Sequence, residues 1–490
     1  MLDQMGWTMP SRISQGFRRQ YLQRQNFRRQ LTDVAAPVTR DFVSFLELYG
    51  SFAGENLADT DEDSLAVADE ETADTSDERR PLLGRRKSTR TANKQGDAGT
   101  TRTFFTLIKA FVGTGIMFLP KAFRNGGILF SAIVLVVVSL VTAVCFRLLL
   151  QCRHRHGGGG YGELGENIVG KYFRTIILSS IALSQLGFVC AGIIFTAENL
   201  ESFLRAVYRG DDLPLGTEAL ILLQFIVLIP LSLIRNISKL GPAALLADVF
   251  ILIGLVYIWQ YDIVSLTQHG INESVTLFNP NAFTLTIGSA IFTFEGIGLI
   301  LPIQSSMKEP QKFERLLYLV MAIITVIFTS VGILCYATFG EATKIQVISN
   351  FPQDDKLVNA VQFIYSLAVL AGEPVQLFPA VRILETSLFG ERATGKKSTA
   401  IKWKKNALRT AAVCFCGAVA IFGASDLDKF VALIGSVACV PLVYIYPPYL
   451  HWKGVAETRL EKALDMGMML LGAVSMIYTT AVTIGQWVQN

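Results

Sequence analysis

The feature that most constrains the fold of this chain is the succession of long apolar runs that follows Thr103. Each run is about twenty residues long, the length at which a helix crosses a hydrocarbon core of roughly 30 Å. Within lipid the helix is required, because every backbone N–H and C=O group must be hydrogen-bonded inside the segment. Charged residues make up only 17% of the chain, below the roughly 25% of soluble domains. The pattern predicts an all-α integral membrane protein.

The apolar runs predict about eleven transmembrane helices, near residues 104–124, 127–150, 174–203, 217–234, 242–265, 283–303, 316–340, 357–385, 406–424, 429–450 and 464–487. An odd number places the two termini on opposite sides of the membrane. Loops 151–173 and 386–405 are rich in Lys and Arg, whereas loop 266–282 has neither. The positive-inside rule then predicts a cytosolic N-terminus and a C-terminus on the lumenal or exterior side. Asn272, in Asn-Glu-Ser, is a glycosylation candidate on that far side.

Residues 1–102 differ in character from the rest of the chain. Asp59–Glu78 contains ten acidic residues and no basic ones, and Arg79–Lys94 is strongly basic. Such blocks bury too little apolar surface to offset chain entropy, so we expect a largely disordered cytosolic tail. Glu78, Leu82 and Leu83 fit the acidic dileucine pattern, which adaptor complexes of the clathrin type read for delivery to lysosome-like compartments. The same short pattern also arises by chance.

Two of the expected spans are interrupted in the same way. The first contains Gly113-Thr114-Gly115 and the sixth contains Gly296-Ile297-Gly298, and Leu-Pro follows each within five residues. Glycine and proline free backbone groups from the helical ladder. At membrane depth such backbone persists only where protein or a watery cavity surrounds it. A single Gly-x-Gly is explained by close helix packing, but two that open corresponding halves favour a binding site.

The spacing of the two breaks divides the chain into two halves of five helices, residues 103–265 and 283–450, followed by an eleventh helix at 464–487. Five helices is an odd number, so the halves have opposite orientations in the membrane. This is the inverted-repeat plan of LeuT-type transporters, whose substrate binds between broken first and sixth helices. Free N–H groups at a half-helix N-terminus suit a carboxylate.

A family resemblance rests on the same residues. Phe105–Phe123 (FTLIKAFVGTGIMFLPKAF), Phe294–Leu301 (FEGIGLIL) and Met307–Pro310 (MKEP) resemble the amino acid/auxin permease family. The long polar tail resembles that of the fungal vacuolar amino acid exporters, relatives of the proton-coupled amino acid transporters. The resemblance implies a LeuT-like fold, a multi-pass vacuolar membrane protein, and amino acid movement linked to protons. The substrate-binding residues that we expect from the two breaks and their surroundings are Gly113, Thr114, Gly115, Ile116, Phe292, Thr293, Phe294, Gly296 and Tyr365.

Ionisable groups within the spans are candidates for coupling to protons. Glu295 adjoins the break in the sixth span, Glu373 lies midway along the eighth, and Asp248 lies in the fifth. A buried carboxyl that is costly to ionise can take up a proton in an acidic compartment and release it in the cytosol. The alternative is a structural carboxylate, paired with Lys109 or capping a broken segment. The four His residues all lie outside the expected spans, at positions His154, His156, His269 and His451.

The leading hypothesis is a secondary active transporter that exports neutral or basic amino acids from an acidic vacuole together with protons. One alternative is an uptake carrier of the plasma membrane, and another is an amino acid sensor that transports little. An enzyme is disfavoured, because the spans contain no nucleophile–base pair or metal cluster. The seven Cys are scattered and predict neither a metal site nor a cofactor. The basic residues are explained by loops beside the spans and predict no nucleic acid partner.

Overall fold

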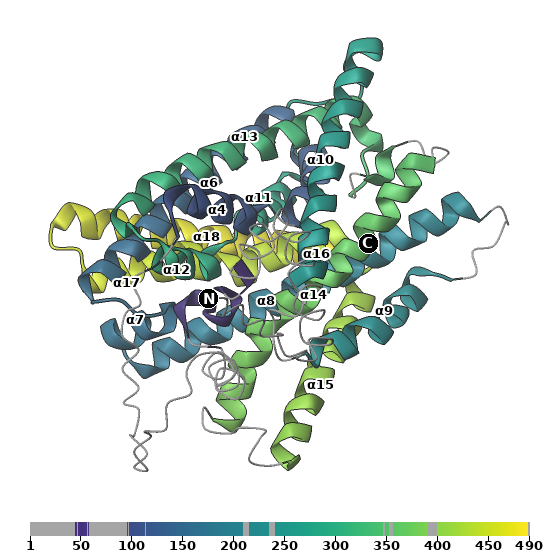
Figure 1. Cartoon of the computed structure of the whole chain (residues 1–490). Coiled ribbons are helices and arrows are strands. Elements are labelled where there is room, and N and C mark those ends of the chain that lie inside the picture. Colours follow the sequence, from purple (N-terminus) through teal and green to yellow (C-terminus); the bar gives the residue numbers. More distant parts are fainter. Residues whose placement is uncertain are drawn as a thin grey trace, which may run out of the picture.

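The computed structural model describes residues 45–488, apart from 47, 56, 58–95, 97, 113, 209–214, 235–240, 346–347, 352–355 and 391–398. Most of these residues lie in helices that pack side by side along much of their length (Figure 1). The helices are α4 (Thr100–Phe111), α5 (Leu119–Gly126), α6 (Ile128–Arg155), α7 (Tyr161–Ile168), α8 (Lys171–Val207), α9 (Thr217–Ser232), α10 (Gly241–His269), α11 (Phe283–Thr293), α12 (Ile297–Ser306), α13 (Phe313–Phe339), α14 (Lys356–Phe389), α15 (Thr399–Gly423), α16 (Leu427–Ile434), α17 (Tyr446–Gly454) and α18 (Arg459–Val488).

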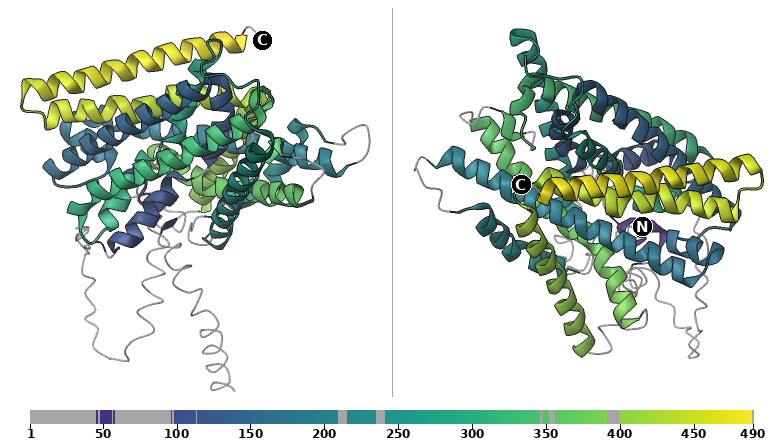
Figure 2. Two further views of the ribbon diagram at one scale, coloured as in Figure 1. Left: turned by 90° about the horizontal axis from the view of Figure 1, so that it is seen from above. Right: turned by 180° about the vertical axis from the view of Figure 1, so that it is seen from behind.

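Nine helical stretches in the described part of the chain are long and apolar enough to cross a membrane. Two predicted spans fall outside this set: the first is interrupted, and α9 has only 16 residues. The all-helical membrane architecture is therefore confirmed, while the count of eleven spans stays a prediction. Figure 2 shows α17 and α18 as a helical hairpin along one side of the bundle.

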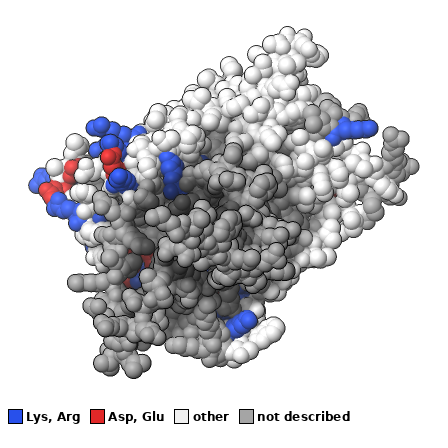
Figure 3. Space-filling model, in the orientation of Figure 1, with Lys and Arg blue, Asp and Glu red and all other residues white. Residues whose placement is uncertain are grey.

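The outer surface of the bundle suits a hydrocarbon environment. Ile226, Val326 and Leu470, on three different helices, are 71%, 69% and 65% exposed. Exposed apolar side chains in such numbers mark a membrane-facing surface. On the face seen in Figure 3, charged side chains gather at one end, beside the connection between α17 and α18, and most of the other described surface carries no charge.

Both predicted breaks are confirmed. A 3-10 turn, η2 (Thr114–Phe118), lies between α4 and α5, and the irregular residues 294–296 lie between α11 and α12. Pro120 stands in the first turn of α5, where a helix needs no N–H donor. The half-helices α4 and α12 pack together at one end of the bundle, and α5 and α11 pack together at the other. We refer to these as the α4/α12 end and the α5/α11 end.

The chain before α4 is also ordered at the α4/α12 end. Ala98 donates its N–H to the carbonyl of Ser306 (2.9 Å) and accepts a hydrogen bond from the N–H of Lys308 (2.9 Å). Part of the expected tail is folded as well: residues 45–57 form a helical turn followed by η1 (Phe52–Gly54) and pack against α12 and α7. We call residues 45–57 the N-terminal segment. Its order differs from the sequence expectation for residues 1–102.

His451 lies inside an apolar helical stretch rather than beyond it. The stretch Leu427–Gly454 joins α16 to α17 through two π-helical turns. His451 is buried, and its Nδ1 lies 2.7 Å from the Asp465 carboxylate of α18. The expectation that all four His lie outside the spans is therefore wrong for His451. It is also wrong for His154 and His269, because α6 and α10 likewise continue past the predicted ends of their spans.

Candidate functional site

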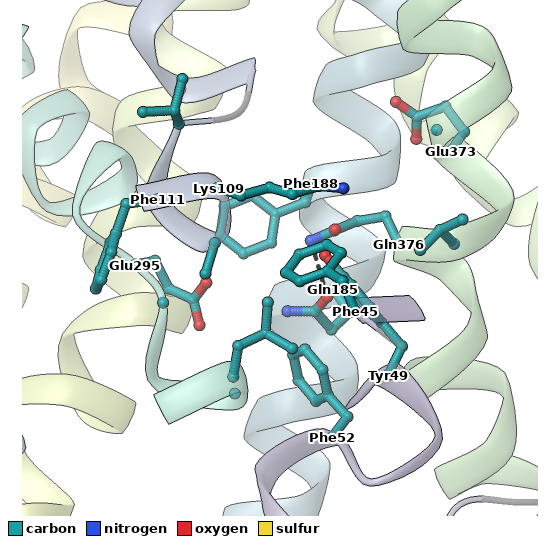
Figure 4. A pocket seen from close by; sticks show the side chains of 18 of the residues that line it. Phe45, Tyr49, Phe52, Lys109, Phe111, Gln185, Phe188, Glu295, Glu373 and Gln376 are labelled. Carbon is teal, nitrogen blue, oxygen red and sulfur yellow. Dashed lines mark hydrogen bonds between the residues drawn. The ribbon is translucent and has the colours of Figure 1, made fainter. Parts of the chain in front are cut away.

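A cavity of about 190 Å³ lies where the two broken spans meet. Its wall is formed by the two breaks, by α8, α10 and α14, and by the N-terminal segment (Figure 4). Most of the lining residues are apolar, and several polar side chains stand among them, as is typical of small-molecule sites. Its polar side chains include Tyr49, Lys109, Gln185, Thr293, Glu295, Glu373 and Gln376.

Three helix ends meet at this cavity. Gly296 and Gly298, at the start of α12, line it, and so do Phe111 and Thr293, which end α4 and α11. The first turn of a helix leaves N–H groups free and carries partial positive charge, and the last turn leaves carbonyls free and carries partial negative charge. Gly296 permits the close approach of the end of α4 to the start of α12, because a Cβ at this position would lie 2.5 Å from the Phe111 ring. The cavity therefore offers fixed partial charges of both signs.

Two glutamines place an amide donor in the wall. Gln376 of α14 donates its side-chain N–H to Oε1 of Gln185 in α8 over 2.8 Å, which fixes the orientation of both amides. Nε2 of Gln185 is buried and has no hydrogen-bond partner among the described residues. A buried donor without a partner is unfavourable, so this group is well suited to bind a polar ligand.

The two glutamates of the wall differ in their surroundings. In Figure 4 the carboxylate of Glu295 points toward the middle of the cavity, whereas Glu373 stands to one side, on α14. Glu373 packs against the backbone of α8 at Gly192, where any Cβ would overlap its carboxyl group. Its Oε2 is buried, and the described residues offer it no hydrogen bond. Glu295 is therefore placed to meet a ligand, and Glu373 to connect α8 with α14.

The structure brings half of the predicted binding and coupling residues together. Glu295 and Glu373 line the cavity together with Gly115, Phe292, Thr293 and Gly296. Three others lie behind this lining: Ile116 is buried, Phe294 packs on Phe328, and the Tyr365 ring lies 5.7 Å from that of Phe195. The predicted role of these three in substrate contact is not seen in this arrangement.

The remaining predicted residues lie elsewhere or outside the described part. Gly113, Glu78, Leu82 and Leu83 are outside the described residues, and only the backbone is described for Thr114 and Asp248. Asn272 is exposed in the loop before α11, and its Oδ1 accepts hydrogen bonds from the N–H and hydroxyl of Ser274. The sequon is therefore on the surface, as glycosylation requires.

The cavity is closed toward the α5/α11 end by aromatic rings. The Phe118 ring meets Phe195 and Phe292 edge to face at 5.6 and 5.8 Å, and Phe188 meets Phe292 at 4.6 Å. Beyond them, Arg124 donates to the carbonyl of Thr343 over 3.1 Å. The ring contacts join η2, α8 and α11, so the described residues close the cavity in that direction.

Toward the α4/α12 end the cavity is covered by the N-terminal segment. Glu55 is buried, and its carboxylate accepts hydrogen bonds from the N–H of Glu163 (2.9 Å) and from Arg174 (3.1 Å). The backbone carbonyl of Leu57 accepts a hydrogen bond from Nε of Arg382 (2.7 Å). The segment is thus held by α7, α8 and α14, which surround this mouth of the cavity.

Comparison with known proteins gives the family. The family model described as "Transmembrane amino acid transporter protein" matches residues 96–485, which include both breaks and all of the cavity wall except the N-terminal segment. The chain belongs to this family.

The relatives of this transporter agree with that assignment. Vacuolar amino acid transporter 3 of Saccharomyces cerevisiae is 43% identical over 484 residues, which cover 97% of this chain and 69% of the relative. Vacuolar amino acid transporter 3 of Schizosaccharomyces pombe is 41% identical over 464 residues, covering 91% and 68%. The solved structure of MhsT in complex with L-phenylalanine is 12% identical, with a TM-score of 0.47, and covers 78% of this chain and 98% of that one. The chain is a transport protein and not an enzyme.

Sequence reasoning missed several groups of this transporter's site. Gln185 and Gln376 are single amides in separate apolar runs, and only the packing of α8 on α14 brings them together. The aromatic residues Phe45, Tyr49 and Phe52 of the N-terminal segment recur at helical spacing, a signal that the polar composition of residues 1–102 concealed. Asp262 of α10 was also overlooked; it is fully buried but does not line the cavity. The sequence signal that could have identified Asp262 is an acidic residue within the apolar run 242–265.

Docking of the N-terminal segment on the transporter is expected to weaken as pH rises. Burial raises the pKa of Glu55, and this effect outweighs the opposing effects of Arg174 and of the hydrogen bond from the backbone N–H of Glu163. The docked state therefore holds the proton more tightly than the undocked state. Docking is favoured below the ordinary carboxyl pKa and weakens as pH rises through the raised one.

The mobility of a spin label at position 51, in a chain with the exposed Cys414 replaced by Ser, should rise between about pH 5 and about pH 8. Glu55→Gln should remove this pH dependence; an equal dependence in that variant would assign it to another group.

Proposed function

We propose that this transporter carries amino acids across the vacuolar membrane and binds them in the cavity between the two broken spans. The observation that carries the proposal is the meeting of three helix ends at that cavity. A free amino acid bears one carboxylate and one ammonium group, so it matches partial charges of both signs. The names of the yeast relatives support the vacuolar membrane as the location.

The geometry supports one binding pose. The carboxylate accepts hydrogen bonds from the N–H groups that begin α12, next to Gly296. The ammonium group donates to the carbonyls that end α4 and α11, near Phe111 and Thr293. The amino acid side chain then extends toward Gln185, whose amide N–H is available. This pose satisfies the charged groups that all amino acids share and leaves selectivity to the wall beside α8 and α14.

Coupling to protons is assigned to Glu295. Its carboxylate points into the cavity, so its charge is felt by the substrate and by the half-helices that must separate during transport. A proton bound there in an acidic vacuole and released on the cytosolic side ties amino acid movement to the proton gradient. Glu373 acts as a second candidate, because its protonation alters the packing of α8 on α14.

The orientation follows from charge. Arg153 and Arg155 end α6 at the α4/α12 end, where Arg153 donates to the carbonyl of Leu301 and Arg155 pairs with Glu457. We infer that this end faces the cytosol, which places Asn272 and the C-terminus in the lumen. Net movement is then export to the cytosol. Delivery to the vacuole through adaptor recognition of Glu78, Leu82 and Leu83 completes the proposal.

The sensor alternative has one specific observation in its favour. The N-terminal segment reaches the cavity, so a bound amino acid can change the state of the tail. A sensor binds amino acids saturably but transports them slowly, and it does not respond to a pH gradient. A plasma-membrane uptake carrier would share the cavity but not the location.

The experiment is amino acid flux in proteoliposomes that contain the purified full-length chain. Labelled L-leucine, L-glutamine and L-lysine are loaded inside, and efflux is followed with and without an acidic interior. The proposal expects saturable efflux that an acidic interior accelerates. Saturable binding without flux under either condition would replace the carrier with the sensor.

A further inference from the structure

The N-terminal segment occupies space that an amino acid needs. Phe45, Tyr49 and Phe52 line the cavity alongside Glu295 and Gln376 (Figure 4). Their rings pack on one another: Phe45 meets Tyr49 at 5.9 Å, and Tyr49 stacks on Phe52 at 5.8 Å. Buried aromatic side chains contribute large contact areas, so these three rings hold the segment in the mouth of the cavity.

The segment fits this mouth closely. The Phe52 ring lies against Gly298 of α12, where a Cβ would overlap it. Gly54 has a φ of +75°, which favours glycine, and a Cβ there would lie 2.7 Å from the Cα of Gly160. Lys109 of α4 places its Nζ 4.2 Å from the centre of the Phe45 ring, a cation–π contact. The segment therefore touches both half-helices, α4 and α12, that line the binding cavity.

The segment is attached to the bundle by a long connection. About 40 residues separate Leu57 from Gly96, so the segment can leave the mouth without moving α4. Its polar anchors among the described residues include the Glu55 carboxylate, bonded to α7 and α8, and the Leu57 carbonyl, bonded to Arg382. With the α5/α11 end closed by aromatic rings, the mouth that the segment covers is the exit from the cavity in this conformation.

We propose that the N-terminal segment is an internal inhibitor, which competes with the amino acid for the α4/α12 end of the cavity and must undock before an amino acid passes. This inference rests on the proposed transport function. Only the undocked fraction of the protein exchanges substrate with that side, so docking lowers the transport rate to that fraction of its undocked value. Anything that holds the tail away from the bundle raises the rate.

The test is the efflux of L-leucine, L-glutamine and L-lysine from proteoliposomes that contain the full-length chain or a single variant. Glu55→Ala removes the anchor to α7 and α8 and leaves every residue of the cavity wall in place. We expect the initial rate to rise about fivefold or more, the lower range of measured couplings between sites. Ser51→Ala is the matched control, because the Ser51 hydroxyl bonds to the Leu48 carbonyl within the segment, and its rate should equal that of the wild type. Phe52→Ala, which removes the ring beneath Gly298, should also raise the rate.

The outcomes separate the inference from the function on which it rests. Equal and measurable rates in the wild type, Glu55→Ala and Phe52→Ala would overturn the inhibitor and leave the transporter intact. Rates that fall in both variants would show that the segment is a structural part of the carrier, which also overturns the inference. No flux in any of the proteins, with or without an acidic interior, would overturn the proposed function together with the inference.

Discussion

Glu295→Gln is expected to abolish the acceleration of amino acid efflux by an acidic interior. The variant keeps the size of the side chain and its ability to form hydrogen bonds, but it cannot change charge. Because the Glu295 carboxylate points into the cavity, we propose it as the group through which a proton acts on the substrate and the half-helices together. We expect the acid-driven rate to fall about tenfold or more, equivalent to ~1.4 kcal/mol of activation free energy. Exchange of labelled for unlabelled amino acid without a gradient should persist.

Two further variants make this result specific. Glu457→Gln removes a carboxylate whose side chain is 70% exposed, at the turn between α17 and α18, and acid-driven efflux should be unchanged. Glu373→Gln should have a smaller effect than Glu295→Gln, since Glu373 stands to one side of the cavity. Full acid stimulation in Glu295→Gln, together with its loss in Glu373→Gln, would move the proton site to the interface between α8 and α14.

Glu385→Ala is expected to cause the largest loss of stability. Glu385 is buried between two arginines: its carboxylate binds Arg382 over 2.9 Å and Arg409 over 2.8 Å. Removing it leaves two buried positive charges without this partner, and breaking a buried pair in this way costs about 3–5 kcal/mol. Arg409 also donates to the Ser232 carbonyl at the end of α9, and Arg382 to the Leu57 carbonyl, so α9, α14, α15 and the N-terminal segment should loosen together.

The loss is measured as the free energy of unfolding in detergent micelles, by denaturant titration. Glu457→Ala is the comparison, because its partner Arg155 has a side chain that is 60% exposed and exposed pairs contribute little. Glu457→Ala should leave the unfolding midpoint where it is in the wild type. Equal shifts in the two variants would show that the cluster around Glu385 does not stabilise the bundle.

The architecture followed from the sequence because lipid leaves few choices. An apolar run of sufficient length must be helical, and two Gly-x-Gly…Leu-Pro stretches in corresponding halves predicted both breaks at their observed positions. The cavity residues Gly115, Thr293, Glu295 and Gly296 could be named for the same reason, since they stand at or beside the breaks. The local sequence did not show which of the side chains around the breaks point into the cavity. Ile116 and Phe294 adjoin predicted lining residues but face away from the cavity, because side chains at neighbouring positions of the chain point in different directions.

Long-range contacts account for what was missed. Gln185 and Gln376 are nearly two hundred positions apart, and neither run shows that its amide faces another. The N-terminal segment was expected to be disordered because its polar neighbours dominate the composition of residues 1–102. Its order comes from surfaces that α7, α8, α12 and α14 provide, so it is not encoded in the segment alone. His451 was placed outside the spans because the predicted span ended at residue 450, whereas the helix continues to Gly454.

A cryo-electron microscopy structure of the purified transporter with a saturating amino acid that it carries would locate the binding site directly. We predict that the carboxylate of the bound amino acid lies at the start of α12 beside Gly296, with its ammonium group near the ends of α4 and α11. We also predict that Phe52 of the N-terminal segment has left the position beneath Gly298. An amino acid bound elsewhere in the bundle, with the segment still in the mouth and the cavity between the breaks unchanged, would contradict these predictions.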